Sequence, residues 1–452
     1  MAAPTASVVN LGCRVNRVEA DRIAEDLERA GWRLTSPEEA ELVVVNSCAV
    51  TGEAEAKTRK AVRRALAAPR SPHVVVTGCA ANLDPDEFTR LSPKVVVEPL
   101  KTRVAARALA ALGEGAQGVQ GAGPRPLDAP SAGRGGGASR TRRGIKIQDG
   151  CNNRCSYCIV WKARGRERSE LLDEVLAQVE AAAAAGVPEV VLTGVNLAAY
   201  RFERPDGGRG GLVELLDLIL SRTAVAQVRL SSLEPMDVDS ALARLMAASG
   251  GRIAPYLHLP LQSGCTATLS RMRRPYTAEG FAATVAALRA ELPALSVSCD
   301  VIVGFPGETE AEFDESCALC EQVGFSRLHV FRYSPRPGTP AADAPDQVPP
   351  EVKAARGRRL RELGGALALA DARARVGSCE RAVLEDGAQG TLGSFHRVAV
   401  EGVPPLEAGS LPLVNVAIMG VEADGLVRAR YVSQVEVPVR GRQEGDSWIP
   451  PK

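Results

Sequence analysis

Short apolar runs alternate with helix-like segments over the first part of the chain. The runs SVVNLGC, ELVVVNSC, HVVVTGC and KVVVE are separated by helical patterns near 18–31, 53–68 and 84–91. Continuous apolar runs between helices are typical of parallel strands covered on both faces. The pattern therefore predicts an open parallel α/β sheet within a domain of residues 1–112. Three of its strands end in cysteines, namely Cys13, Cys48 and Cys79.

The periodicity stops and then resumes. Residues 113–140 are rich in Gly, Ala, Pro and Ser, which predicts a flexible linker. From Gly144, strands and helices alternate again in six units, with helical stretches at 169–185, 211–222, 238–249, 277–291 and 310–323. Repeated parallel units of this kind form a barrel or a doubly wound sheet, and a long basic helix completes a domain over residues 141–376.

Polar residues cluster where these six strands end. In a barrel, the carboxyl ends of the strands form the active face, so these side chains are expected to ring a common mouth. Each one taken alone is equally well explained as a helix cap or a turn residue. They are Asn196, Glu234, Gln262, Asp300, Glu308 and Arg332.

The last part of the chain has a different pattern of apolar and polar residues. Short alternating segments punctuated by Gly and Pro predict a small antiparallel β domain over residues 377–442, and residues 443–452 are expected to form a tail. No secretory signal pattern and no run of about 18 apolar residues is present. A reducing cytoplasm is therefore expected, where the 11 cysteines indicate metal binding or catalysis rather than disulfides.

Cys151, Cys155 and Cys158 form a C-x3-C-x2-C motif on one short segment. Soft thiolates select iron–sulfur clusters or zinc, and three thiolates can each bind a different iron of a cubane while its fourth iron stays open. A structural zinc site usually closes with a fourth Cys or His at short spacing, and none follows nearby. The three strand-end cysteines would also converge, because ligand sites form outside the carboxyl ends of parallel strands. They predict a second three-thiolate cluster, with ordinary buried cysteines as the alternative.

The motif, with Tyr157 before its last cysteine, resembles the signature of radical S-adenosylmethionine (SAM) enzymes. Segments along nearly the whole chain resemble the methylthiotransferases of that class: LGCRVN, IKIQDGCNNRCSYC, ARGRERS, LTGVNL, RLSSLEP, LHLPLQSG, DVIVGFPGET and FRYSPRPGTPAA. ARGRERS and GVNL in particular resemble the subfamily that acts on N6-threonylcarbamoyladenosine beside the tRNA anticodon.

The resemblance implies an α/β multidomain protein with a partial (β/α)6 barrel and a TRAM-like β-barrel at the end. It implies two 4Fe-4S clusters, held by Cys151, Cys155 and Cys158 and by Cys13, Cys48 and Cys79. SAM would be both the methyl donor and the source of a radical that abstracts hydrogen from adenine C2. An electron donor such as flavodoxin or ferredoxin is expected, and the sulfur donor stays open. The residues expected to bind the cofactor are Tyr157, Asn196, Glu234, Gln262, Asp300 and Arg332.

The region around the cysteine motif is strongly basic. Residues 140–168 contain nine Lys or Arg against two acids, a local charge of +7 in a chain of net charge +1. Cations that pair with phosphates bind nucleic acid, although a charge run is often only a solvated face. The terminal β domain carries more acids than bases, so its RNA role rests on the resemblance. The residues expected to contact RNA are Arg142, Arg143, Arg154, Lys162, Arg164, Arg166 and Arg168.

Two other readings remain open. One keeps the chemistry and changes the substrate to N6-isopentenyladenosine in tRNA or to an aspartate of a ribosomal protein. The other is a non-catalytic RNA-binding protein with structural zinc. Cys265 and Cys299 are expected to be small packing residues. Cys317 and Cys320 form C-x2-C inside an expected helix and lack a second pair for a metal site, so they are expected to be helix-face residues.

Overall fold

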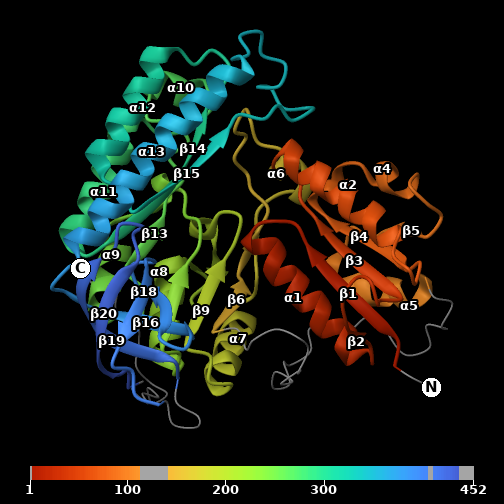
Figure 1. The fold of residues 1–452 in the computed structure, drawn as a ribbon, viewed down its shortest axis with the longest axis horizontal. Helices are drawn as coiled ribbons and strands as arrows, with labels where there is room; N and C mark the ends of the chain where they lie inside the picture. Colours follow the sequence, from red (N-terminus) through yellow and green to blue (C-terminus); the bar gives the residue numbers. More distant parts are fainter. Residues whose placement is uncertain (1–2, 112–140, 406–410, 437–452) are drawn as a thin grey trace.

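The computed structural model describes residues 3–111, 141–405 and 411–436. Figure 1 shows three parts: an amino-terminal α/β domain, a central barrel and a small carboxyl-terminal β-barrel packed below it. The linker predicted at 113–140 and the tail at 443–452 lie outside the described residues.

The amino-terminal domain is an open parallel sheet, as the apolar runs predict. Its strand order is β2-β1-β3-β4-β5, and every pair is parallel. Alternate residues of β3 enter two different cores, with Val43 and Val45 on one face and Leu42 and Val44 on the other. This two-sided burial explains the continuous apolar run. The elements are β1 (Thr5–Asn10), α1 (Arg14–Arg29), β2 (Arg33–Leu34), β3 (Leu42–Ser47), α2 (Gly52–Leu66), β4 (His73–Gly78), α3 (Cys79–Leu83), α4 (Pro85–Thr89), β5 (Val95–Val97) and α5 (Val104–Ala111).

The central domain contains the six predicted βα units. Its strands form two parallel sheets, β12-β9-β6 and β13-β14-β15, which the bridges Val228–Ile253 and Ser232–His258 join into one curved surface. No pairing joins the edge strands β6 and β15 in the described chain, so the barrel is partial. The strands are β6 (Arg142–Lys146), β9 (Glu189–Thr193), β12 (Gln227–Leu230), β13 (Tyr256–His258), β14 (Ser296–Val303) and β15 (Arg327–Arg332).

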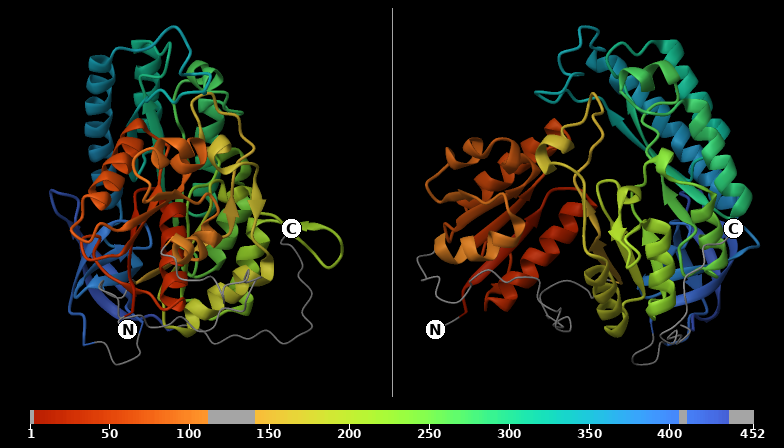
Figure 2. Two further views of the ribbon diagram at one scale, coloured as in Figure 1. Left: turned by 90° about the vertical axis from the view of Figure 1, so that its right-hand side faces the viewer. Right: turned by 180° about the vertical axis from the view of Figure 1, so that it is seen from behind.

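Helices cover the outside of this barrel, as Figures 1 and 2 show. In β14, Val297, Cys299 and Val301 pack into the core beneath the helices. Ser298 and Asp300 alternate with them, so the interior face of the strand is polar. Cys317 and Cys320 also pack into this core, and Cys265 is buried, which agrees with packing roles. The helices are α7 (Leu172–Ala184), α8 (Leu212–Arg222), α9 (Ser240–Ala248), α11 (Ala278–Glu291), α12 (Glu310–Val323) and the long α13 (Pro350–Ala374).

The carboxyl-terminal strands form a closed five-stranded barrel. Its order is β16-β17-β18-β20-β19, and closure leaves no free sheet edge. Four of the pairings are antiparallel, while β18 and β20 run parallel. The strands are β16 (Cys379–Asp386), β17 (Gln389–Leu392), β18 (Arg397–Glu401), β19 (Leu413–Val421) and β20 (Val427–Gln434).

A buried arginine joins this barrel to the base of the central one. Arg229 of β12 donates to the Glu189 carboxylate at 2.8–3.1 Å and to the carbonyls of Gly393 and Leu392 at 2.9 and 3.2 Å. Burial alone raises the pKa of Glu189, yet Arg229 and Arg142 outweigh it, and the net pKa is lowered. The ionised pair therefore connects the two domains.

Removing this arginine is expected to destabilise the protein. Arg229→Met leaves Glu189 buried with Arg142 as its remaining partner, and breaking such a buried pair costs about 3 kcal/mol. Urea unfolding monitored by tryptophan fluorescence should show a lower midpoint. The matched control is Arg428→Met, which breaks an exposed pair with Glu401 and should change stability by less than about 1 kcal/mol. Equal midpoints for the two variants would contradict the bridging role.

Candidate functional site

The cysteine motif lies on a loop closed at its neck. β7 (Gln148–Asp149) pairs antiparallel with β8 (Arg168–Ser169), just after β6. Gly150 has φ +70°, and a Cβ there would lie 2.0 Å from the Arg166 carbonyl oxygen. Only glycine fits this conformation and this close approach. The neck places the cysteines at the carboxyl end of the first barrel strand, the face where such folds bind ligands.

The thiols on this loop influence one another's ionisation. Burial raises the pKa of Cys151 to about 11 and that of Cys158 to about 12, and in both cases neighbouring thiols of the motif add to the shift. Thiols of this kind ionise only when a positive centre or hydrogen-bond donors compensate them. Donors are present on all three sulfurs: the Asn153 N–H on Cys151 at 3.4 Å, the Val160 N–H on Cys158 at 3.4 Å and Arg274 on Cys155 at 3.0 Å.

Arg274 connects the cysteine loop to the barrel interior. Its side chain is nearly buried and pairs with Glu234, one of the predicted cofactor residues, while it also donates to Cys155. It donates further to the Tyr276 hydroxyl at 3.1 Å. The sequence prediction missed Arg274, because the segment RMRRPYT has no motif that distinguishes one arginine from its neighbours.

Gln262 and Tyr157 have unusual local environments. Gln262 has φ +68°, a left-handed conformation that costs energy for a non-glycine residue and is often found at functional sites. Its backbone holds this position through hydrogen bonds to Asp300 at 2.8 Å and Ile302 at 2.9 Å. Tyr157 packs against a small core containing Met272 and Tyr333 rather than standing free on the loop.

The remaining predicted mouth residues differ in whether their polar groups already have partners within the protein. Among the residues that the structure describes, none donates a hydrogen bond to the buried Oδ1 of Asn196, so that acceptor could serve a ligand. Asp300 lies 3.4 Å from His258 Nε2 inside the barrel, and Arg332 is exposed at the end of β15. Glu308 differs from the expectation: it is buried and accepts bonds from the Gly304 N–H at 2.6 Å and Arg356 at 2.8 Å. Its carboxylate is used within the protein.

The strand-end cysteines converge at one edge of the amino-terminal sheet. Cys48 directly follows β3, Cys79 directly follows β4, and Cys13 lies three residues beyond β1. These three strands are neighbours in the sheet. Burial raises the pKa of Cys48 to about 11, and the thiols of Cys79 and Cys13 raise it further, so the three sulfurs lie within electrostatic reach of one another.

Two asparagines brace this edge. Asn46 Nδ2 donates to the Asn16 carbonyl at 2.7 Å, and Asn16 Nδ2 donates to the Ser47 carbonyl at 2.8 Å. A Cβ on Gly12 would lie 2.4 Å from the Asn16 side chain, so this turn requires glycine. The bracing holds the strand ends that carry the cysteines in a fixed relation.

The two cysteine sets are brought together by the short helix α6 (Val160–Arg164). It begins two residues after Cys158 and packs against α3, whose first residue is Cys79. Ile159 and Ala163 are part of the amino-terminal domain's core. The loop that carries one cysteine set is therefore embedded in the domain that carries the other.

Arg164, at the end of α6, is buried between the two sets, which corrects the prediction that it contacts RNA. Its side chain is 4% exposed and pairs with Glu19 and Asp149, both at 2.9 Å. It also donates to Asn16 Oδ1 at 2.7 Å. Burial raises the pKa of Cys79, and the Arg164 charge acts to lower it. Burial and two carboxylate partners make this position internal, so the guanidinium is not available to RNA.

The other basic residues differ in the partners that the described part of the chain gives them. Arg142 also departs from the RNA prediction, because it is engaged by Glu189 and Glu385 at the domain junction. Arg154 lies over the Trp161 ring at 4.0 Å, and Arg166 is exposed. The remaining predicted RNA residues are partly engaged: Arg143 with Glu25 at 2.5 Å, Lys162 with the Gly338 carbonyl at 2.6 Å and Arg168 with Asp149 at 2.7 Å.

The candidate metal ligands in both sets are thiols, which bind iron–sulfur clusters or zinc. Among the described residues, no group of three or more His, Cys, Asp or Glu side chains is arranged to hold one metal ion. The thiolates of a cubane bind separate irons and are therefore spaced more widely than the ligands of one ion. Each of the two sets offers three thiols, the soft ligands that iron–sulfur clusters select. None of the described helices combines the length and apolar character that spanning a bilayer requires.

Comparisons with known proteins match both regions of the chain that carry the cysteine sets. The Radical SAM superfamily pattern matches residues 145–320, and that of Uncharacterized protein family UPF0004 matches residues 5–98. A radical SAM methyltransferase, TsrM from Kitasatospora setae, superimposes with a TM-score of 0.53 at 18% identity, covering 75% of this chain and 77% of that one, which shows a shared fold. Fold and cysteine loop thus define a radical SAM protein.

Proteins related in sequence identify the family within this class. The threonylcarbamoyladenosine tRNA methylthiotransferase MtaB of Thermotoga maritima is 37% identical, covering 79% of this chain and 81% of the relative, and that of Bacillus subtilis is 37% identical over 80% and 81%. The tRNA-2-methylthio-N(6)-dimethylallyladenosine synthase of Acidothermus cellulolyticus is 34% identical over 98% and 90%. The chain belongs to the radical SAM tRNA methylthiotransferase family, whose members use a 4Fe-4S cluster and SAM.

Proposed function

We propose that this transferase adds a methylthio group to C2 of N6-threonylcarbamoyladenosine next to the tRNA anticodon, with two 4Fe-4S clusters and SAM as both methyl donor and radical source. The observation that carries the proposal is the packing of α6 against α3, which brings two three-cysteine sets to the same region. A single cluster would leave the second convergent set without a role.

The chain's own side chains would divide the work between two centres. Cys151, Cys155 and Cys158 would hold the cluster that, with SAM, supplies radical chemistry capable of breaking an unactivated C–H bond. Cys13 and Cys48, with Cys79, would hold the second cluster. The residues expected to bind SAM around the first cluster are Tyr157, Asn196, Glu234, Gln262, Asp300 and Arg332.

Binding and orientation of tRNA would use the free cations on the cysteine loop. Arg154 and Arg166 are exposed beside the first set, and Arg168 is 60% exposed although it also pairs with Asp149. A target base must be splayed out of its loop to reach a buried centre. Trp161, stacked under Arg154, offers an aromatic face at the rim.

We further propose the domain division used by the sequence prediction: 1–112, a linker at 113–140, the barrel with its trailing helix at 141–376, the TRAM-like barrel at 377–442 and a tail at 443–452. A cytoplasmic location and an electron donor such as flavodoxin or ferredoxin would suit a reductively driven enzyme acting on tRNA.

Nucleoside analysis tests the substrate. Deleting the gene should remove 2-methylthio-N6-threonylcarbamoyladenosine from tRNA and leave its precursor unthiolated, as measured by liquid chromatography and mass spectrometry. Wild-type protein should restore the nucleoside, and the Cys151→Ala variant should not. Restoration by Cys151→Ala, or an unchanged nucleoside in the deletion strain, would refute the assignment.

The second candidate substrate is the dimethylallyl, or isopentenyl, adenosine of tRNA. The Acidothermus relative that acts on it covers 98% of this chain, more than the two threonylcarbamoyl relatives cover. Loss of the methylthio group from that nucleoside in the same experiment would favour this candidate.

A further inference from the structure

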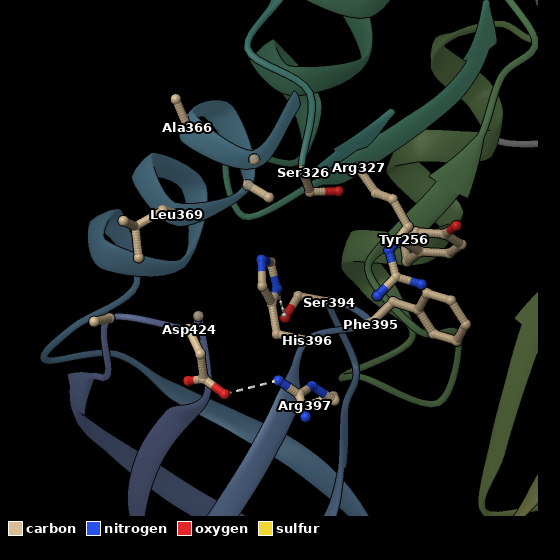
Figure 3. A pocket seen from close by; sticks show the side chains of 14 residues that line it. Tyr256, Ser326, Arg327, Ala366, Leu369, Ser394, Phe395, His396, Arg397 and Asp424 are labelled. Atoms are coloured by element: carbon tan, nitrogen blue, oxygen red, sulfur yellow. Dashed lines mark hydrogen bonds and ion pairs between the residues drawn. The ribbon is translucent and has the colours of Figure 1, made fainter. Parts of the chain in front are cut away.

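An aromatic ring in the carboxyl-terminal barrel lies among three arginines. Phe395, in the loop between β17 and β18, has guanidinium carbons of Arg229, Arg327 and Arg14 at 4.8, 5.3 and 5.4 Å from its ring centre. The Tyr256 ring is 4.7 Å away. Figure 3 shows Tyr256, Arg327 and Phe395 grouped at one side of a cavity of about 450 Å³. The three arginines come from two domains and meet the third domain at this ring.

Phe395 is held in an unfavourable backbone conformation. Its φ is +74°, in the left-handed region that bulky side chains rarely adopt. Arg229 holds this loop in place through the carbonyls of Gly393 and Leu392. Strain that the surrounding structure maintains is a pointer to function rather than to stability.

Two of the three guanidiniums are not neutralised. Arg229 is fully engaged by Glu189 and by backbone carbonyls. In the part of the chain that the structure describes, neither Arg14 nor Arg327 pairs with a carboxylate, and both are exposed. Their charges reach a common neighbour: burial lowers the pKa of His329, Asp300 opposes this shift, and His258, Arg327 and Arg14 lower the pKa further.

One of these cations lies beside the strand-end cysteines and the other lies on a barrel strand. Arg14 directly follows Cys13 and opens α1, whose amino-terminal end favours negative charge. Arg327 begins β15, and His329 lies two residues along the same face of that strand, beside His258. His258 in turn contacts Asp300 inside the barrel. Arg14 therefore lies beside the strand-end cysteines, and Arg327 lies at the amino-terminal end of β15, near the base of the barrel where Arg229 holds the Phe395 loop.

We propose that Arg14 and Arg327, supported by the Phe395 ring, form an oxyanion site that binds the free carboxylate of the threonylcarbamoyl group. The inference rests on the proposed function and deepens it. A guanidinium offers a planar fork that binds a carboxylate through two parallel hydrogen bonds, and an aromatic face beside it orients that fork. The dimethylallyl group is a hydrocarbon, and placing it here would desolvate both cations without a partner, so the site selects against it.

A tRNA phosphate is the other oxyanion that two arginines could bind, so the test separates the two sources. Two anticodon stem-loop RNAs are compared that are identical except that one carries N6-threonylcarbamoyladenosine and the other unmodified adenosine. Binding to the anaerobically reconstituted full chain is measured by fluorescence anisotropy. Wild-type protein should bind the modified RNA roughly 10-fold or more tightly than the unmodified RNA, which is the effect of one good ionic contact.

Arg14→Gln and Arg327→Gln should each weaken binding of the modified RNA about 10-fold and leave the affinity for the unmodified RNA unchanged. The matched control is Arg17→Gln, an exposed arginine one turn further along α1, which should change neither. Equal losses for both RNAs would assign the arginines to a phosphate and overturn the proposal. Retained discrimination in both variants would also overturn it while the proposed function stands.

Failure of the proposed function has a different signature. Wild-type protein that does not distinguish the two RNAs, together with nucleoside analysis that finds no threonylcarbamoyl product, would remove the substrate and this inference with it. Wild-type protein that makes the product but does not distinguish the RNAs would overturn the inference alone.

Discussion

Cys48→Ala is expected to abolish methylthio transfer to tRNA while SAM cleavage continues. Cys48 is buried at the end of β3, beside the thiols of Cys79 and Cys13. Removing one of three thiolates should prevent the second cluster from assembling and leave the first intact. Anaerobic assays should detect 5′-deoxyadenosine and no methylthiolated nucleoside.

Two further variants serve as controls for this result. Cys151→Ala should eliminate both SAM cleavage and product, because it removes a ligand of the first cluster. Cys320→Ala, a buried cysteine in the core beneath α12, should retain both activities apart from a modest loss of stability. Full product from Cys48→Ala would show that the strand-end set holds no catalytic cluster.

Arg164→Met is expected to have the second-largest effect, on both stability and product. The substitution leaves Glu19 with Lys101 and Lys146 and leaves Asp149 with Lys146 and Arg168, and loss of a buried ion-pair partner costs about 3–5 kcal/mol. Because α6 also packs against α3, the two cysteine sets should lose their fixed relation. Thermal unfolding should begin at lower temperature, and product should fall more than SAM cleavage does.

Arg166→Met is the matched control, since it removes an exposed arginine two residues away. It should leave the thermal midpoint unchanged and weaken tRNA binding only modestly. If Arg164→Met behaved like Arg166→Met, the burial of Arg164 between the cysteine sets would have no structural importance.

Periodicity predicted the fold well because strand burial is encoded locally. The side chains of the run LVVVNS in β3 enter two cores, one on each face of the sheet. Such a run can be recognised as a buried strand without knowing which strands pair with it. The convergence of Cys13, Cys48 and Cys79 followed from the same rule, since parallel strands end at one edge. The start of α1 at Arg14 was missed by four residues, because its cap, Cys13, makes no capping hydrogen bond and its first residues are polar.

Side-chain partners distant in sequence could not be predicted. A count of local charge made Arg164 look like its neighbours Arg166 and Arg168, and only the fold brings Glu19 to it from 145 residues away. Arg274 and Phe395 carry no motif, and their roles depend on contacts with a cysteine loop and with arginines from other domains. Local composition reports how many charges are present but not which of them the protein neutralises.

Iron counting after anaerobic reconstitution tests the central claim most directly. Wild-type protein should bind about eight irons per chain as two 4Fe-4S clusters. A variant with Cys13, Cys48 and Cys79 replaced by alanine should bind about four, and so should one with Cys151, Cys155 and Cys158 replaced. About four irons in wild-type protein, with no further loss when the strand-end cysteines are removed, would contradict two clusters in one chain.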